Sequence, residues 1–335
     1  MTNLKSFFVC AATSLFLLTL SGCHAMNTDK TPPVEPISTE TNSRIVEDGG
    51  TGPYSASMVS DSTLATHTIF RPKDLSVFGR KNKLPVIAWG NGACANSPWE
   101  HVNFLSEIAS HGFLVIAIGP MPQEGQRGGG FGMTRGRNMT SGENTSSNSQ
   151  LIDAINWAIA QDSNQTSIYY NKIDTAKIGV AGMSCGGLQA YEAAPDPRVA
   201  TVMICNSGIF NTPMGGSGAR RGGGGLSGMP NLTKEHLEKL HSPIIFILGG
   251  ESDMAYSNGM DDFRRINDLP VVAANLDVGH GGTYSRPHGG EFAIVATAWL
   301  QWQLKGDEEA SKMFVGSPCE LSQRTGWKVE KKNIP

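Results

Sequence analysis

Short apolar runs alternate with segments of helical spacing over most of the chain between residues 85 and 305. Residues 85–89 (Pro-Val-Ile-Ala-Trp) form a continuous apolar run, and residues 99–109 then carry apolar side chains at helical spacing. Residues 113–118 form the next apolar run. Strands that are apolar on both faces are typical of covered sheets, and strands that alternate with helices favour parallel pairing. We therefore predict an α/β fold, with a mostly parallel central sheet flanked by helices on both faces.

This alternation extends along the chain and is interrupted twice. Two glycine-rich stretches, residues 123–142 and 215–229, follow the carboxyl ends of predicted strands, where open α/β sheets bind ligands. Because long loops in compact domains are usually functional or disordered, we expect both stretches to form lid loops. The remaining predicted elements are strands over residues 54–60, 64–71, 177–181, 199–204, 244–248 and 271–276, and helices over residues 151–160, 188–194 and 292–304.

The first 22 residues have the features of an export signal. Lys5 is followed by an almost wholly apolar stretch over residues 7–20, which suits a signal-peptide core and is short for a membrane span. The sequence Leu-Ser-Gly-Cys that ends at Cys23 resembles the lipobox of bacterial lipoproteins, in which the cysteine carries lipid. An ordinary signal peptide with an incidental cysteine is the alternative. The resemblance implies an exported protein, anchored to the cell envelope through a lipid on Cys23, on the outer-membrane or periplasmic side or on the cell surface.

The residues after Cys23 are polar and contain hardly an apolar pair. Their content of Thr, Pro, Ser, Glu and Asn is typical of a flexible linker, so we predict a tether over residues 23–50. Residues 51–335 form the predicted folded domain. Hydrophobic residues make up 39% of the chain, which is enough for a sizeable core.

The charge balance argues against a nucleic-acid partner. The chain has 27 Lys and Arg against 30 Asp and Glu, whereas dedicated nucleic-acid binders usually need a strong basic excess. Arginine-glycine tracts near residues 127–137 and 220–221 are much shorter than the arrays that bind RNA. Neither a Cys-x-x-Cys nor a His-x-x-x-His spacing occurs, so we expect no metal site.

Ser184 is the candidate nucleophile. It lies in Gly182-Met-Ser-Cys-Gly186, which fits the Gly-x-Ser-x-Gly pattern of a nucleophile elbow. The match follows the predicted strand over residues 177–181 directly and precedes a helical segment. On such a turn a serine presents its hydroxyl above the sheet, and the N-terminus of the next helix favours negative charge there. A buried serine in a glycine turn is the alternative reading.

A nucleophilic serine needs a base and a carboxylate that orients the base. His280 and Asp253 each follow a predicted strand, in the order Ser, acid, His. We predict His280 as the base and Asp253 as the acid, with His288 and Glu251 as the competing residues. The other histidines are expected at the surface or in caps: His67, His101, His111, His236 and His241.

The oxyanion of an acyl-transfer intermediate needs two backbone N–H donors. One belongs to the residue after the nucleophile, which is Cys185. The other is expected in the loop after the strand over residues 85–89, where Ala93 is the predicted donor and Gly92 or Cys94 could replace it.

On these motifs the chain resembles the α/β-hydrolase superfamily over residues 54–314, and within it the secreted esterases and polyester hydrolases of the dienelactone-hydrolase-like branch. It departs from the commonest pattern at Asn91, where His is usual, and in the two glycine-rich stretches. The resemblance implies a catalytic domain over residues 51–335 and a two-step serine carboxylic-ester hydrolysis by Ser184, His280 and Asp253, without metal or organic cofactor. A small-molecule or polymeric ester would be the substrate.

If Cys10 leaves with the signal and Cys23 carries lipid, four cysteines remain, at positions 94, 185, 205 and 319, and they allow three pairings. Cys205 ends the strand expected beside that of the nucleophile. We therefore predict a Cys185–Cys205 disulfide, which leaves Cys94 and Cys319 as the second pair. Disulfides are compatible with export.

Other functions use the same apparatus or the same fold. A lipase, peptidase or thioesterase shares the triad, and a non-catalytic surface lipoprotein, either an adhesin or a pseudoenzyme, shares the fold. A long-chain lipase would favour an apolar lid, whereas these stretches are rich in glycine, arginine and serine. This composition favours short-acyl, aryl, carbohydrate or polyester substrates. The sequence does not indicate the oligomeric state.

Overall fold

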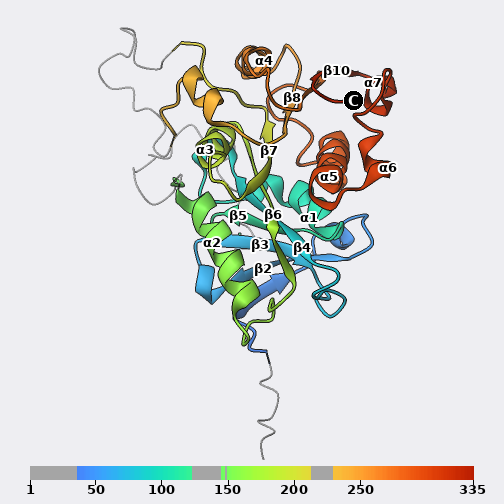
Figure 1. Cartoon of the computed structure of the whole chain (residues 1–335). Helices are drawn as coiled ribbons and strands as arrows, with labels where there is room; N and C mark the ends of the chain where they lie inside the picture. Colours follow the sequence, from blue (N-terminus) through green and yellow to red (C-terminus); the bar gives the residue numbers. More distant parts are fainter. Residues whose placement is uncertain (1–35, 123–144, 148, 213–228) are drawn as a thin grey trace, which may run out of the picture. The chain divides into compact units, whose positions relative to one another are not determined.

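A central β-sheet runs through the protein in a computed structural model that describes residues 36–122, 145–147, 149–212 and 229–335 (Figure 1). Within these residues the sheet has ten strands in the order β1-β2-β3-β5-β4-β6-β7-β8-β9-β10. The strands from β5 to β9 in this order run parallel, whereas β1, β2, β3 and β10 pair antiparallel with their neighbours. The strand bounds are Glu40–Arg44 (β1), Ala56–Asp61 (β2), His67–Pro72 (β3), Leu84–Gly90 (β4), Leu114–Ile118 (β5), Ile173–Met183 (β6), Val199–Cys205 (β7), Ile244–Leu248 (β8), Val271–Leu276 (β9) and Trp327–Lys332 (β10).

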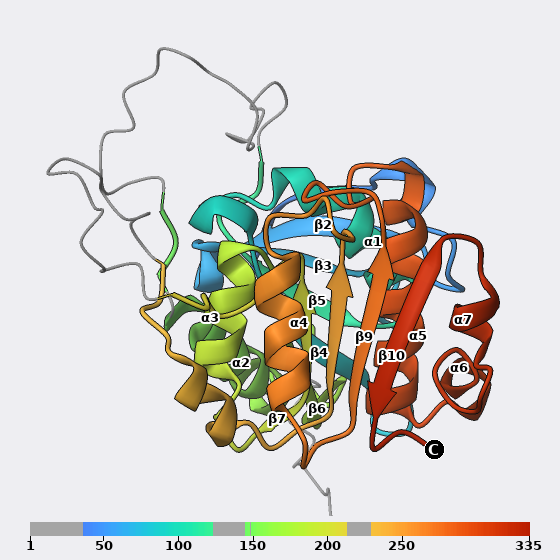
Figure 2. The ribbon, with the colours of Figure 1, turned by 90° about the horizontal axis from the view of Figure 1, so that it is seen from above.

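Helices cover both faces of this sheet, as predicted (Figure 2). Successive residues of a strand point to opposite faces, so Val86 and Ala88 of β4 belong to the core cluster that α2, α3 and α4 cover, while Ile87 and Trp89 belong to the cluster that α1 and α5 cover. The α-helices are Val102–Ser110 (α1), Ser149–Ser163 (α2), Cys185–Ala193 (α3), Tyr256–Arg265 (α4), Gly290–Lys305 (α5), Glu308–Ser311 (α6) and Glu320–Gln323 (α7). Short 3-10 helices are Glu47–Gly49 (η1), Ser62–Leu64 (η2), Gly92–Cys94 (η3), Trp99–His101 (η4), Lys234–Lys239 (η5) and Pro287–Gly289 (η6).

The chain changes direction across the sheet at β4. From β4 it crosses through α1 to β5 on one side, and it then returns through α2 to β6 on the other side of β4. The carboxyl ends of β4 and β6 are therefore neighbours, with Gly90 paired to Gly182. In open α/β sheets ligands bind outside the carboxyl ends of the strands at such a switch point.

Part of the segment that we predicted as a tether belongs to the sheet. Residues Glu40–Arg44 form the edge strand β1, and the carboxylate of Glu40 pairs with the guanidinium of Arg71 in β3. The folded unit accordingly begins at Pro36. The predicted tether is therefore wrong over residues 36–50, because backbone pairing at a sheet edge does not require apolar side chains.

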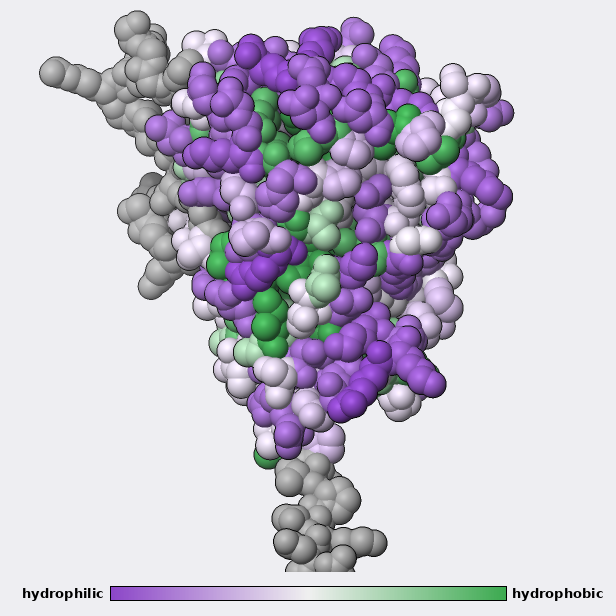
Figure 3. Space-filling view, in the orientation of Figure 1, coloured by the Kyte–Doolittle hydropathy of each residue, from purple (hydrophilic) through white to green (hydrophobic). Residues whose placement is uncertain are grey.

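Several predictions fall outside the described residues. These are the signal over residues 1–22, the lipid site Cys23, the lid over residues 123–142 and nearly all of the lid over residues 215–229. Hydrophilic residues cover most of the face in Figure 3, with smaller hydrophobic areas between them. Within the described ranges, no helix has the length and apolar character needed to cross a membrane.

Two histidines that we expected at the surface or in caps are buried in the fold. His67 is fully buried in β3, and its Nε2 lies 2.9 Å from the carbonyl oxygen of Gln150. His101 is packed between the rings of Trp89 and Tyr284. Burial lowers the pKa of His101 to about 3, so its imidazole is neutral. A neutral imidazole can pack as an aromatic ring, which the residue type alone does not reveal.

Candidate active site

Ser184 lies on a sharp turn between β6 and α3. Its φ of 53° and ψ of −116° are unfavourable for a residue with a β-carbon. The neighbouring strand holds the turn, because the Ser184 N–H donates to the carbonyl oxygen of Cys205 at 2.9 Å. The Ser184 carbonyl in turn accepts hydrogen bonds from the Ser207 hydroxyl at 2.6 Å and the Gly187 N–H at 2.9 Å. The backbone of Ser184, the candidate nucleophile, is thus held by hydrogen bonds at its N–H and at its carbonyl.

The glycines of the elbow allow two backbones to touch. A β-carbon on Gly182 would lie 2.2 Å from the carbonyl oxygen of Gly186. A β-carbon on Gly186 would lie 2.1 Å from the carbonyl carbon and oxygen of Gly90, at the end of β4. Only glycine permits this packing, so the Gly-x-Ser-x-Gly pattern has a steric basis in this fold.

The structure brings the three predicted triad side chains together. His280, after β9, has Nε2 3.0 Å from Oγ of Ser184, and its Nδ1 lies 2.6 Å from Oδ1 of Asp253. Asp253 follows β8 and its side chain is fully buried. The competing residues lie elsewhere: Glu251 is exposed, and His288 lies with its Nδ1 3.7 Å from the carboxylate of Glu107.

Asp253 is surrounded by hydrogen-bond donors. Its Oδ1 accepts from His280 and from the Ala255 N–H at 2.9 Å, while its Oδ2 accepts from the Asn206 amide at 2.8 Å and the Gly249 N–H at 3.2 Å. Burial alone would raise the pKa of this carboxyl, but the hydrogen bonds from His280, Ala255 and Asn206 together lower it below the ordinary value. The carboxylate is therefore ionised where the imidazole needs an anionic partner.

Two buried side chains that sequence reasoning missed complete this network. The hydroxyl of Tyr284 donates to Oδ1 of Asn206, whose amide nitrogen donates to Asp253. Asn206 directly follows β7, at the same sheet edge as the triad, and this position could have identified it. Tyr284 lies four residues after His280 in a loop, where the sequence offers no such signal.

The loop after β4 has an unusual backbone. Ala93 and Cys94 both have positive φ values, of 54° and 51°. The Asn91 amide holds the base of the loop, since it donates to the carbonyl oxygens of Ala95 at 3.0 Å and Ile118 at 2.7 Å. Asn91 therefore has a structural role in this loop. Backbone strain of this kind concentrates at functional sites.

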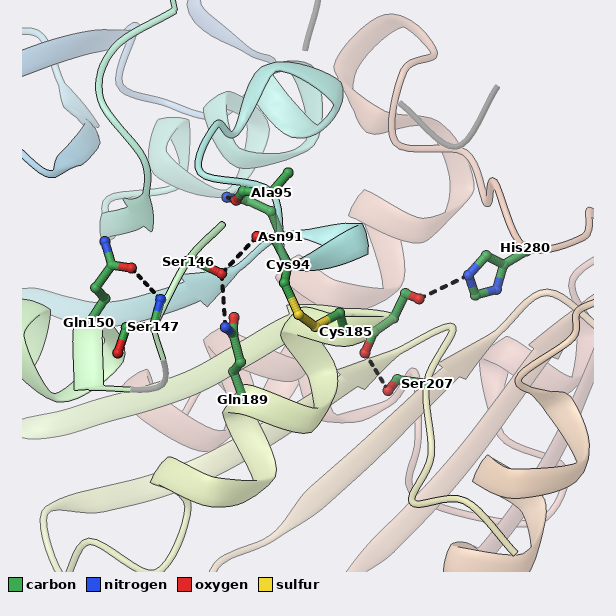
Figure 4. Close-up of a disulfide and its surroundings, with 11 residues drawn as sticks. Asn91, Cys94, Ala95, Ser146, Ser147, Gln150, Cys185, Gln189, Ser207 and His280 are labelled. Carbon is green, nitrogen blue, oxygen red and sulfur yellow. Dashed lines mark hydrogen bonds between the residues drawn. A yellow bond between two sulfur atoms is a disulfide. The ribbon is translucent and has the colours of Figure 1, made fainter. Parts of the chain in front are cut away.

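A disulfide joins this loop to the elbow (Figure 4). Cys94 and Cys185 are bonded, with their Cα atoms 5.2 Å apart, which is within the usual range for a disulfide. The predicted Cys185–Cys205 and Cys94–Cys319 pairs are therefore wrong, and Cys205 and Cys319 are buried free cysteines. The reason is the turn at Ser184: Met183 pairs with Cys205, but Cys185 lies beyond the turn, on α3.

Among the side chains that the structure describes, no group of three or more His, Cys, Asp and Glu residues is arranged to hold a metal ion. The sequence matches no model of a known protein family, and no curated protein matches it. The case for function therefore depends on the site itself.

Proposed function

We propose that this protein is a serine carboxylic-ester hydrolase of the α/β-hydrolase superfamily. One observation supports it above all: Ser184 Oγ lies 3.0 Å from His280 Nε2, and His280 Nδ1 lies 2.6 Å from a buried carboxylate oxygen of Asp253. This is the arrangement that nucleophile, base and orienting acid require for acyl transfer. Its position at the switch point of a parallel sheet also favours a ligand site.

In the first half-reaction, Ser184 Oγ attacks the ester carbonyl carbon while His280 Nε2 accepts the hydroxyl proton. His280 then gives this proton to the leaving alcohol as the carbon–oxygen bond breaks, and an acyl-enzyme remains. In the second half, His280 takes a proton from water, which attacks the acyl carbon. The bond from this carbon to Ser184 Oγ then breaks, the acid leaves, and His280 returns the proton to Oγ. Asp253 stays ionised throughout, because the hydrogen bonds around it hold its pKa low.

The oxyanion would be bound by the N–H groups of Ala93 and Cys185. Cys185 is the first residue of α3, so its N–H has no partner within the helix and points from the helix N-terminus. Ala93 lies in the adjoining η3 turn, next to the half-cystine bonded to Cys185. Each such donor contributes about 2.7–4 kcal/mol to transition-state stabilisation.

The substrate class and the cellular location are also proposals. The glycine-rich composition of residues 123–142 and 215–229 supports lid loops suited to short-acyl, aryl, carbohydrate or polyester esters. The lipobox-like sequence supports export and a lipid anchor on Cys23 at the cell envelope. An exported hydrolase of this kind would meet its ester substrate outside the cytoplasm.

The experiment is hydrolysis of p-nitrophenyl esters, from acetate to dodecanoate, by the domain without its signal and by its Ser184→Ala variant. We expect turnover that falls with acyl length and is lost in the variant. Turnover that survives Ser184→Ala would contradict the assignment of the nucleophile. A folded, unmutated protein without activity on any ester would favour a non-catalytic surface lipoprotein instead.

A further inference from the structure

The Cys94–Cys185 disulfide connects the two peptide segments that carry the proposed oxyanion donors. Cys94 directly follows Ala93, and Cys185 is itself the second donor and directly follows Ser184. We propose that this disulfide is a positioning element for catalysis: it holds the N–H groups of Ala93 and Cys185 at a fixed separation, so that activity depends on the bond being formed. The inference rests on the proposed function.

The loop that carries Ala93 needs such a constraint. Consecutive residues with β-carbons, Ala93 and Cys94, both adopt left-handed φ values. Backbone of this kind persists only where its surroundings over-determine it. The hydrogen bonds of Asn91 fix the base of the loop, whereas the disulfide fixes its far end to the start of α3.

A non-covalent contact joins the same two segments nearby (Figure 4). The Cys94 carbonyl accepts hydrogen bonds from the N–H of Ser146 at 2.8 Å and from its hydroxyl at 3.0 Å. The amide of Gln189, on α3, donates to the Ser146 hydroxyl at 2.8 Å. Ser146 therefore bridges α3 to the loop without a covalent bond, and its side chain offers a matched comparison with the disulfide.

The disulfide is shielded from solvent. Cys94 is fully buried and Cys185 is 2% exposed. A dithiol reductant would transfer two electrons and two protons, which breaks the Sγ–Sγ bond, yields two thiols and converts the reductant to a cyclic disulfide. Because this attack needs access to a buried sulfur, substitution of the cysteines is the cleaner test.

The test measures how fast a fluorophosphonate labels Ser184. In this reaction the Oγ attacks phosphorus, fluoride leaves and His280 takes the proton, while the phosphoryl oxygen occupies the oxyanion position.

We compare the unmutated protein with Cys94→Ala/Cys185→Ala, Ser146→Ala and Cys319→Ala, all shown to be folded by circular dichroism. For the double variant we expect labelling, and kcat for p-nitrophenyl acetate, to fall by about 10- to 1,000-fold with a smaller change in KM. We expect Cys319→Ala to stay within about two-fold of the unmutated protein, and Ser146→Ala to lose less than the double variant.

The outcomes separate the two claims. If the unmutated protein is labelled at Ser184 and the folded double variant is labelled equally fast, the positioning role is wrong and the proposed function stands. If the folded, unmutated protein is not labelled at Ser184, the proposed function is wrong and this inference falls with it. If the double variant does not fold, the deciding measurement is the activity of the folded, unmutated protein while the dithiol reduces its disulfide. We expect this activity to fall as Cys94 and Cys185 become thiols and to return when the disulfide forms again. Full activity with both cysteines reduced would overturn the proposal.

Discussion

The amide of Asn206 donates to Oδ2 of Asp253 at 2.8 Å, on the side of the carboxylate opposite the oxygen that faces His280. Asn206 is fully buried and is itself held by the hydroxyl of Tyr284. The orientation of the candidate acid thus depends on Asn206, which directly follows β7, and on Tyr284, in the loop after His280.

Asn206→Ala should lower kcat/KM without unfolding the protein. The variant removes a hydrogen bond to an ionised carboxylate, which is worth about 1.5–3 kcal/mol, or roughly 10- to 150-fold in rate if it is realised in the transition state. The measurement is steady-state hydrolysis of p-nitrophenyl acetate. Asn42→Ala, at an exposed position of the edge strand β1, is the matched control. Equal rates for both variants would show that Asn206 does not orient Asp253.

Tyr284→Phe should have a smaller effect on activity than Asn206→Ala. It keeps the buried ring, which packs against His101 and Phe104, and removes only the hydroxyl, which donates a hydrogen bond to Oδ1 of Asn206. We expect kcat to fall less than ten-fold, because the lost bond is one step removed from the carboxylate and is worth about 1 kcal/mol. A loss larger than that of Asn206→Ala would contradict a role that acts only through Asn206.

Gly186→Ala should destabilise the fold. The new β-carbon would lie 2.1 Å from the carbonyl of Gly90. Gly90 cannot move without disturbing its pairing with Gly182 of β6, and Gly186 belongs to α3, which packs on both β4 and β6. We expect the free energy of unfolding to fall by about 2 kcal/mol or more in urea titrations. Gly79→Ala is the comparison, since a β-carbon there meets nothing within 4 Å. A similar small effect for both variants would contradict the close backbone contact.

Buried His101 should make the protein sensitive to acid. Its pKa is about 3 in the folded state and near 6.5 when unfolded, so its contribution to stability is fully present above pH 6.5 and is lost as the pH falls through this window. Between pH 7 and pH 5 the unmutated protein should lose about 2 kcal/mol of unfolding free energy more than His101→Phe. Urea titrations at both pH values measure this difference. If both proteins lose the same amount, His101 is not held neutral by burial.

The fold could be predicted wherever burial dictates residue type. The strands Ile244–Leu248 and Val271–Leu276 have the predicted bounds, because a strand covered on both faces must be a continuous apolar run. The polar helix Tyr256–Arg265 and the charged edge strand Trp327–Lys332 were missed. Their positions depend on tertiary packing against β8 and β9, which their own residues do not reveal.

The site could be predicted in part for a similar reason. Ser184, Asp253 and His280 each follow a strand, and parallel strands bring their carboxyl ends to one edge. The disulfide could not be predicted, because the sequence does not tell which side of the turn at Ser184 the thiol of Cys185 takes. Tyr284 reaches Asn206 only through the folded loop, so no local pattern identifies it.

The most direct test of the central claim is the mass of the intact protein after brief mixing with p-nitrophenyl acetate and acid quenching. The account predicts one acetyl group on the unmutated protein, located by peptide mapping at Ser184, and none on Ser184→Ala. Hydrolysis with an acetyl group on another residue, or equal acetylation of the Ser184→Ala variant, would contradict it.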